Sequence, residues 1–280
     1  MLKPWMMAAA AIAFAMFGAD ADAKEWKKVK IATEGAYAPW NFTNAAGKLE
    51  GFEIDLVNDL CKRMKVECEI VAQDWDGIIP GLNAGKYDAI SAGMSITARR
   101  LEVINFSAPY ASTPGALVVS KSSPLARLPV DRTYSFDKEK EAAEKAVEGL
   151  KAAFKGKVIA AQVSTIHSNF LETYFKGVAD VRTYKTTEQH DLDLSAGRVD
   201  GAIASVGYWK PLLAKPEGKD FVMVGPTFSG GLFGGGIGVG LRKADGDLKK
   251  LFDTAIDAAI KDGTVNKLSM QWFKFDVTPQ

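Results

Sequence analysis

The stretch Leu82-Asn83-Ala84-Gly85-Lys86-Tyr87-Asp88 has a second, closely related version in the chain, Leu194-Ser195-Ala196-Gly197-Arg198-Val199-Asp200. Each version has the pattern of a helix end, a glycine cap, a basic residue and a strand that opens with aspartate. Five residues beyond each aspartate stand Gly93 and Ser205, at equivalent predicted strand ends. A unit that recurs in both halves predicts two lobes of related fold.

Strand and helix patterns alternate around both versions. The first half predicts strands at 29–33, 66–72 and 87–91, with helices at 52–64 and 74–83. The second half predicts strands at 157–162, 181–185 and 199–204, with helices near 169–175 and 188–195. Residues 245–275 have helical spacing that breaks at Gly263. This alternation is typical of parallel α/β sheets.

Polar residues follow several of the predicted strands. Glu34 and Ser164 come after the first strand of each half. Ligands of open parallel sheets bind beyond the carboxyl ends of the strands. Two facing sheets would therefore place Glu34, Gly93, Ser164 and Ser205 around one cleft.

Composition narrows the class of protein. The 280 residues suit one large domain or two medium ones, and 47% of them are hydrophobic, which excludes a disordered chain. A net charge of +1 argues against a nucleic-acid binder. Two histidines, with no HExxH or CxxC, predict no metal site. No GxSxG, GxGxxG or phosphate-binding loop occurs, and we expect no cofactor.

Residues 1–23 predict a secretory signal peptide. Lys3 precedes an apolar run at 6–18, and Ala21-Asp22-Ala23 has the small-x-small pattern of a cleavage site. The alternative is a membrane anchor, but a spanning helix needs about 20 apolar residues. The mature chain would begin at Lys24. In an oxidising compartment Cys61 and Cys68 can pair and close a small loop; the alternative is two buried free thiols.

The run from Ser91 to Arg100 is the densest candidate for a small-molecule site. A predicted strand ends at Gly93, and the next helix opens near Thr97. Arg100 in the first turn of that helix opposes the helix dipole and needs an anion, which a ligand carboxylate would supply together with Ser95. The alternative is a surface arginine or one paired with a protein acid.

Three other side chains fit the same cleft. Tyr37 and Trp75 either belong to the core or form two rings that flank a ligand and stack on a cation. Glu34 either pairs with a guanidinium or ammonium group or is simply exposed.

Two further segments can each be interpreted in two ways. Residues 137–154, within a stretch at 122–154, predict a charged, alanine-rich surface helix on the second half, the alternative being a solvated helix without function. Residues 230–240 are rich in glycine and predict a flexible strand that crosses between lobes, the alternative being a tightly packed strand.

Several stretches together resemble a known family. They are Thr33-Glu34-Gly35-Ala36-Tyr37-Ala38-Pro39-Trp40, Gly51-Phe52-Glu53-Ile54-Asp55-Leu56, Ser95-Ile96-Thr97-Ala98-Arg99-Arg100, Ile104-Asn105-Phe106-Ser107 and Lys274-Phe275-Asp276. They look like the polar amino-acid-binding proteins of bacterial ABC importers, over nearly all of residues 24–280. The resemblance implies a type II periplasmic-binding-protein fold, with two α/β lobes, two hinge strands and a cleft between the lobes. Hinges near 111–113 and 234–236 would separate lobe 1 (24–111 plus 235–280) from lobe 2 (112–234).

The resemblance also implies roles for individual residues. Arg100 and Ser95 would hold the ligand's α-carboxylate, with Thr165 reaching it from a helix N-terminus in the second lobe. Tyr37 and Trp75 would stack on the ligand side chain, and Glu34 would hold its distal cation. Gly93 and Gly115 would line the wall. The remaining expected contacts are Met94, Gln162, Ser164 and Ser205. Cys61 and Cys68 match the disulfide pair of the lysine/arginine/ornithine and histidine binders.

Ser205 departs from the family pattern. Most α-amino-acid binders have an aspartate there that pairs with the ligand's α-ammonium, and its loss costs on the order of 1.5–3 kcal/mol. A ligand whose α-nitrogen carries a second carboxylated group fits better, because its own charge offsets the cation. Octopine and nopaline are such opines, and residues 162–171 resemble their binding subgroup. The alternatives are plain arginine, lysine, ornithine or histidine, or another polar solute.

The resemblance implies a monomeric periplasmic receptor that delivers its ligand to an ABC permease. One alternative is an enzyme of the cyclohexadienyl dehydratase type, which would need a general acid or base; Glu34 is the one acid expected in the cleft. Another is a sensor module that docks on a membrane receptor. We expect a binding protein without catalytic activity.

Overall fold

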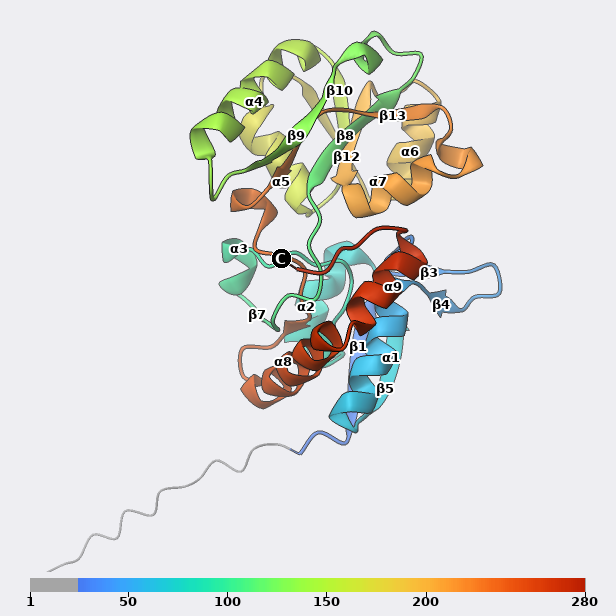
Figure 1. Cartoon of the computed structure of the whole chain (residues 1–280), viewed down its shortest axis with the longest axis vertical. Coiled ribbons are helices and arrows are strands. Elements are labelled where there is room, and N and C mark those ends of the chain that lie inside the picture. Colours follow the sequence, from blue (N-terminus) through green and yellow to red (C-terminus); the bar gives the residue numbers. More distant parts are fainter. Residues whose placement is uncertain (1–24, 280) are drawn as a thin grey trace, which may run out of the picture.

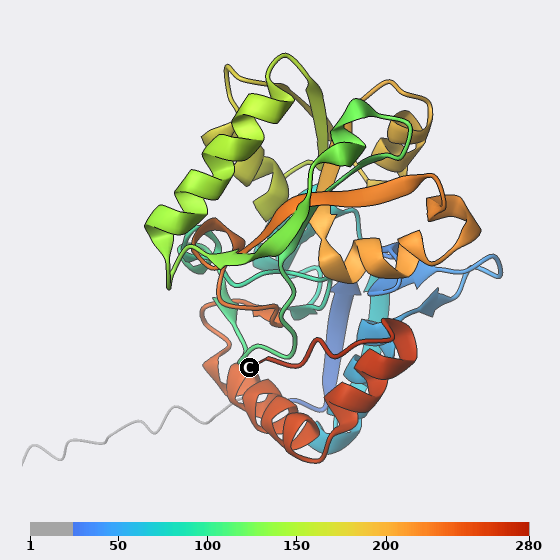
Figure 2. The same ribbon diagram turned by 45° about the horizontal axis from the view of Figure 1, so that its top comes forward.

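The computed structural model describes residues 25–279, so the predicted signal peptide at 1–23 lies outside the described residues. Two bodies of sheet and helix follow one another along the longest axis (Figure 1). The segment after the last helix runs back between these bodies, as the view in Figure 2 shows. There Ser112 N–H donates to the Val277 carbonyl at 2.7 Å. The predicted α/β fold with two lobes agrees with this arrangement.

The first body is built on a sheet with the strand order β5-β1-β6-β14-β7. Its strands are β1 (Lys28–Thr33), β5 (Glu67–Ala72), β6 (Ala89–Ile90), β7 (Asn105–Phe106) and β14 (Gly240–Leu241). β1 pairs in parallel with β5 and β6, whereas β14 is antiparallel to both of its neighbours. β14 therefore brings the C-terminal part of the chain back to the first sheet.

Helices cover both faces of this sheet. On one face α1 (Phe52–Met64) packs against α8 (Gly246–Lys261) and α9 (Thr264–Trp272), around fully buried Val29 and Ile31. On the other face lie the short helices η1 (Trp75–Gly77), α2 (Ile78–Asn83) and α3 (Ala98–Leu101). A small sheet of β2 (Ala36–Tyr37), β3 (Asn41–Thr43) and β4 (Leu49–Glu50) adjoins α1. The predicted break at Gly263 is confirmed, since this glycine separates α8 from α9 with a φ of 80°.

The second body has a six-stranded sheet with the order β11-β10-β12-β8-β13-β9. Its strands are β8 (Gly115–Ser120), β9 (Val130–Ser135), β10 (Val158–Gln162), β11 (Asp180–Tyr184), β12 (Gly201–Ser205) and β13 (Phe221–Ser229). Side chains of α4 (Lys140–Phe154) and α5 (Ile166–Tyr174) share one apolar cluster with the sheet. Those of α6 (Thr187–Ser195) and α7 (Val206–Leu213) share another. The short helices η2 (Pro124–Arg127), η3 (Pro216–Gly218) and η4 (Gly231–Phe233) complete the chain's helices within 25–279.

The aspartate of the repeated unit makes an equivalent hydrogen bond in both bodies. Asp88 Oδ2 accepts a hydrogen bond from Lys30 N–H at 3.0 Å, and Asp200 Oδ2 accepts one from Val158 N–H at 2.8 Å. Each aspartate stands just before its own strand and ties it to the neighbouring parallel strand. Gly85 and Gly197 have φ values of 74° and 68°, which suit glycine at a helix end. The sequence repeat is therefore a structural repeat.

Residues 122–154 are not confined to the surface of the second body. The predicted helix is present as α4, but Val147 and Phe154 on its inner face are fully buried against the sheet. The segment before it forms η2 and the edge strand β9, which pairs in parallel with β13. An exposed strand of the sequence VDRTYS lacks the apolar alternation that identifies strands, so the sequence did not predict it.

Residues 230–240 do cross from the second body to β14 of the first, but they form η4 and a loop rather than a strand, and their glycines are closely packed. A Cβ at Gly234 would lie 2.2 Å from the Ile96 carbonyl oxygen, and one at Gly236 would lie 2.9 Å from Pro109 Cβ. Both residues also have positive φ, at 80° and 116°. Glycine is required here by close backbone approach.

The predicted disulfide is confirmed. Cys61 near the end of α1 is bonded to Cys68 in β5, with their Cα atoms 6.2 Å apart. Between residues 25 and 279, no helix is both long enough and apolar enough to cross a bilayer. The same residues contain no cluster of three or more potential metal ligands.

Candidate ligand-binding site

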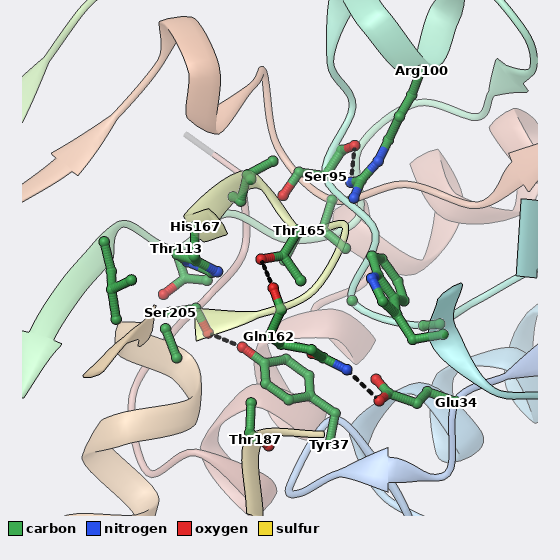
Figure 3. A pocket seen from close by; sticks show the side chains of 17 residues that line it. Glu34, Tyr37, Ser95, Arg100, Thr113, Gln162, Thr165, His167, Thr187 and Ser205 are labelled. Carbon is green, nitrogen blue, oxygen red and sulfur yellow. Dashed lines mark hydrogen bonds between the residues drawn. The ribbon is translucent and has the colours of Figure 1, made fainter. Parts of the chain in front are cut away.

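A pocket lies where the carboxyl ends of the strands of both sheets meet (Figure 3). It encloses about 570 Å³, counting the space at its mouth. Nine predicted residues line it: Glu34, Tyr37, Trp75, Gly93, Ser95, Arg100, Gln162, Thr165 and Ser205. They come from both bodies, and three of the four residues of the strand-end argument, Glu34, Gly93 and Ser205, are among them.

The polar groups of the pocket fall into three sets, which we call its corners. Arg100 forms the first corner. Its side chain donates to the Ser95 carbonyl at 2.9 Å and to the Ser164 carbonyl at 3.3 Å, and its Cζ lies 5.1 Å from the centre of the Trp75 ring. Burial lowers the pKa of Arg100 to about 10. In the described part of the chain no carboxylate forms an ion pair with it. A partly buried cation with only carbonyl partners favours an anionic ligand group.

The start of α5 faces the same pocket. Thr165 caps this nine-residue helix, since its Oγ1 accepts from Ser168 N–H at 3.1 Å while Ser168 Oγ accepts from Thr165 N–H at 3.1 Å. Thr165, Ile166 and His167 all line the pocket. The positive end of a helix dipole therefore adds to the attraction of Arg100 for an anion.

Glu34 forms the second corner, on the side of the pocket away from Arg100 in Figure 3. Only 8% of it is exposed, and its Oε1 accepts a hydrogen bond from Gln162 Nε2 at 2.6 Å. Burial raises the pKa of Glu34 to about 7, although the bond from Gln162 opposes this shift. Glu34 is the one acidic side chain among the described pocket-lining residues. A buried carboxylate beside an aromatic ring suits a ligand cation.

The third corner is made of hydroxyl groups. Ser205 Oγ accepts from Tyr208 N–H at 3.1 Å and lies 2.8 Å from the Tyr37 hydroxyl. The Tyr37 ring stacks on Tyr208, with ring centres 5.1 Å apart and planes 4° from parallel. Thr113 Oγ1 accepts from Gly207 N–H at 2.9 Å. Because Ser205 and Tyr37 share one hydroxyl bond, one of the two protons is free for the pocket, and this corner offers donors without a negative charge.

A buried carboxyl group supports the walls of the first body. Glu53 is fully buried, and it accepts from Gly93 N–H at 2.7 Å, from Asn41 Nδ2 at 2.6 Å and from the Tyr110 hydroxyl. Asn41 Oδ1 in turn accepts from Gly35 N–H at 2.7 Å. This network fixes the loops that carry Glu34 and Gly93. This role of Glu53 was not predicted from the sequence.

The structure does not place three of the predicted contacts in the pocket lining. Met94 is fully buried in an apolar cluster with Ile78 and Leu82. Gly115 faces the Phe233 ring, whose Cε1 would lie 2.3 Å from a Cβ there. Ser164 is exposed with a φ of 58°, and it offers only its carbonyl, to Arg100.

Sequence reasoning missed other lining residues: Ala92, Thr113, Ile166, His167, Thr187, Ile203, Ala204 and Ile237. Two of these residues could have been identified from the sequence. Thr113 lies in the predicted hinge at 111–113, and His167 follows the cap residue Thr165 in the first turn of α5. The others are apolar or sit on elements whose approach to the pocket depends on how the two bodies face each other.

Comparisons with known proteins agree with this geometry. Residues 29–275 match the family model of the bacterial extracellular solute-binding proteins, family 3. The octopine-binding periplasmic protein of Rhizobium meliloti is 46% identical over 92% of this chain and 94% of its own length. The lysine/arginine/ornithine-binding periplasmic protein of Escherichia coli is 36% identical, over 89% and 88%.

A solved structure has the same architecture. It is a periplasmic His/Glu/Gln/Arg/opine family-binding protein from Silicibacter pomeroyi in complex with lysine, 35% identical, with a TM-score of 0.72. The match covers 90% of this chain and all of that one. With a matching family model, close relatives over almost the whole length and a pocket between two α/β bodies, the chain belongs to the bacterial extracellular solute-binding proteins, family 3.

Proposed function

We propose that the protein captures an arginine-derived opine of the octopine or nopaline type, an N-carboxyalkyl arginine, and delivers it to an ABC permease. The observation that carries this proposal is the arrangement of the three pocket corners. Arg100 suits a carboxylate, Glu34 suits a cation, and the Ser205 corner contains hydroxyl donors. An amino acid with a basic side chain satisfies the first two corners.

The assigned orientation follows from these charges. The α-carboxylate of the ligand would bind Arg100 and the start of α5, and its guanidinium would displace Gln162 at Glu34 or share the carboxylate with it. Trp75 and Tyr37 would contact the aliphatic stem. The α-nitrogen and its substituent would then point to Ser205 and Thr113.

The third corner favours the opine over plain arginine. A free α-ammonium there would meet hydroxyl groups, whereas a secondary amine with its own carboxylate brings an acceptor to those donors. The 46% identity to an octopine-binding protein supports this ligand class. The second candidate is a plain basic amino acid, favoured by the lysine in the Silicibacter structure and by the Escherichia coli relative.

Ligand capture would proceed by closure of two lobes, 24–111 plus 235–280 and 112–234. Bonds between these parts already connect Tyr37 with Ser205 and Glu34 with Gln162, and Arg100 with the Ser164 carbonyl. A ligand that touches both sides at once binds the closed form better and increases its population. The hinge positions near 111–113 and 234–236 are part of this proposal.

The periplasm is the proposed location, because the named relatives are periplasmic binding proteins. Cleavage after Ala23 would release a free, monomeric receptor. The relatives are binding proteins, and Glu34 has a proposed role as a cation partner. No catalytic step is therefore assigned.

A thermal-shift panel tests the proposal. Ligand-stripped protein beginning at Lys24 is heated with arginine, lysine, ornithine, histidine, octopine or nopaline, each at about 1 mM. A ligand with a dissociation constant 1,000-fold below its concentration adds about 4 kcal/mol of stability. A large rise in melting temperature with an opine and a small one with arginine is the expected result. A rise with arginine or histidine alone would refute the opine assignment and favour the second candidate.

A further inference from the structure

His167 is a pocket residue that the three-corner arrangement leaves unexplained. Its side chain lines the pocket from the first turn of α5, and only 8% of it is exposed (Figure 3). Its Nε2 atom is buried and has no hydrogen-bond partner among residues 25–279. An unpaired polar atom in a buried position costs free energy unless a ligand supplies the partner.

Packing places His167 on the side of the third corner. Ser205 pairs with Gly115 across the β12–β8 ladder. The Phe233 ring rests on Gly115, where a side chain would collide with it. His167 packs against Phe233, with ring centres 6.0 Å apart and planes at 65°. Gly115 therefore acts through Phe233, which supports the imidazole ring from behind.

The imidazole is neutral under ordinary conditions. Burial lowers the pKa of His167 to about 3, and the nearby charge of Arg100 acts in the same direction. A neutral imidazole carries one N–H donor and one acceptor nitrogen. The group that an N-carboxyalkyl ligand would bring to this side is a carboxylate, which only accepts hydrogen bonds, so Nε2 would have to carry the proton.

We propose that His167 Nε2–H donates a hydrogen bond to the second carboxylate of an N-carboxyalkyl arginine and so selects this ligand over plain arginine. The inference rests on the proposed function, because plain arginine has no group to place there. It gives a specificity role to a residue that neither the charge pattern nor the strand-end argument identified.

Paired affinity measurements test the role. Octopine and arginine are titrated by calorimetry into ligand-stripped protein, its His167→Phe variant and its His167→Gln variant. Phenylalanine keeps an aromatic ring against Phe233 but has no donor, whereas glutamine keeps a terminal N–H. Glu172→Gln, an exposed position on the same helix, is the matched control. Since the hydrogen bond is charge-assisted, His167→Phe should weaken octopine about 10- to 100-fold and arginine less than about 3-fold.

The outcomes separate this inference from the proposed function. If the wild-type protein binds arginine but no opine, the proposed function fails and the inference falls with it. If the wild-type protein binds octopine and His167→Phe weakens both ligands alike, or neither, the function stands and the role of His167 is refuted. Recovery of octopine affinity in His167→Gln supports donation from the Nε2 position.

A second measurement needs no variant. The chain has two histidines, so the imidazole signals of ¹⁵N-histidine-labelled protein are few, and fully buried His190, which does not line the pocket, serves as the internal reference. Octopine should shift the Nε2–H signal of His167 downfield, while arginine should leave it near its ligand-free position. Equal responses to both ligands would overturn the inference even if His167→Phe fails to fold.

Discussion

Replacing Ser205 with aspartate should reverse the ligand preference of the pocket. The position suits aspartate as a helix cap, because Ser205 is the N-cap residue of α7 and accepts from Tyr208 N–H at 3.1 Å. Aspartate caps helices as well as serine does, and its charge is favourable at a helix N-terminus. The Tyr37 hydroxyl, 2.8 Å from Ser205 Oγ, would donate to the new carboxylate.

The expected magnitude follows from the contact that is gained. A hydrogen bond between a carboxylate and the α-ammonium of plain arginine contributes about 1.5–3 kcal/mol. This corresponds to roughly 10- to 150-fold tighter binding of arginine. An opine brings its second carboxylate to the same side of the pocket, so two negative charges would face each other there, and octopine should bind more weakly.

Calorimetric titration of both ligands into Ser205→Asp measures the two effects directly. Ser205→Asn is the matched control, because asparagine is also a good N-cap residue but carries no charge. The control should change the two affinities far less than the aspartate does. If Ser205→Asp shifts arginine and octopine in the same direction, the assignment of the α-nitrogen to this corner is refuted.

Three further predictions concern the other corners and the disulfide. Arg100→Ala should abolish measurable binding of any carboxylated ligand while the ligand-free melting temperature stays near that of the wild type; unchanged affinity in calorimetry would contradict the site. Because burial raises the pKa of Glu34 to about 7 and a ligand cation favours its ionised form, arginine affinity should be constant at high pH and fall up to about 10-fold per unit below that value. Glu34→Gln should bind weakly and without this pH dependence. The double variant Cys61→Ser/Cys68→Ser should lose about 2 kcal/mol of stability, seen as a lower melting temperature, with ligand affinity unchanged because neither residue lines the pocket.

The proposed closure and the proposed ligand preference both involve the contacts that span the two bodies. Glu34 and Gln162 share a buried hydrogen bond, as do Tyr37 and Ser205. These bonds occupy polar groups that line the pocket. A ligand must therefore offer better partners to each group than the protein does, which is easiest for a ligand with one charge per corner.

Local patterns accounted for the architecture. Both aspartates of the repeat lie where their side chains must bridge neighbouring parallel strands, as Asp88 does with Lys30 and Asp200 with Val158. Such contacts depend on the order of residues within one unit and recur wherever that order recurs. The same holds for the Thr165 cap, whose partners lie within three residues, and for the disulfide, whose cysteines are seven positions apart.

Side-chain direction at the pocket wall depended on neighbours far away in the chain. Met94 is next to Gly93 but is fully buried in an apolar cluster with Ile78 and Leu82, because the chain turns at Gly93 after β6 has ended. Gly115 was expected to make room for a ligand, yet the room is taken by Phe233, which approaches from a segment more than a hundred residues later. Strand periodicity gives the face of a residue, but it does not reveal which distant side chain fills that face.

By itself, then, the sequence determined the alternation of strands and helices, the two related halves, the residues at the strand ends and the absence of aspartate at Ser205. These are properties of short segments, since hydrogen bonding and capping act over a few residues. Only the tertiary structure decided that Phe233 rests on Gly115, that Glu53 ties the pocket loops together and that His167 lines the pocket with an unpaired nitrogen. Those facts arise from packing between distant segments, where shape and burial select one partner among many that the sequence allows.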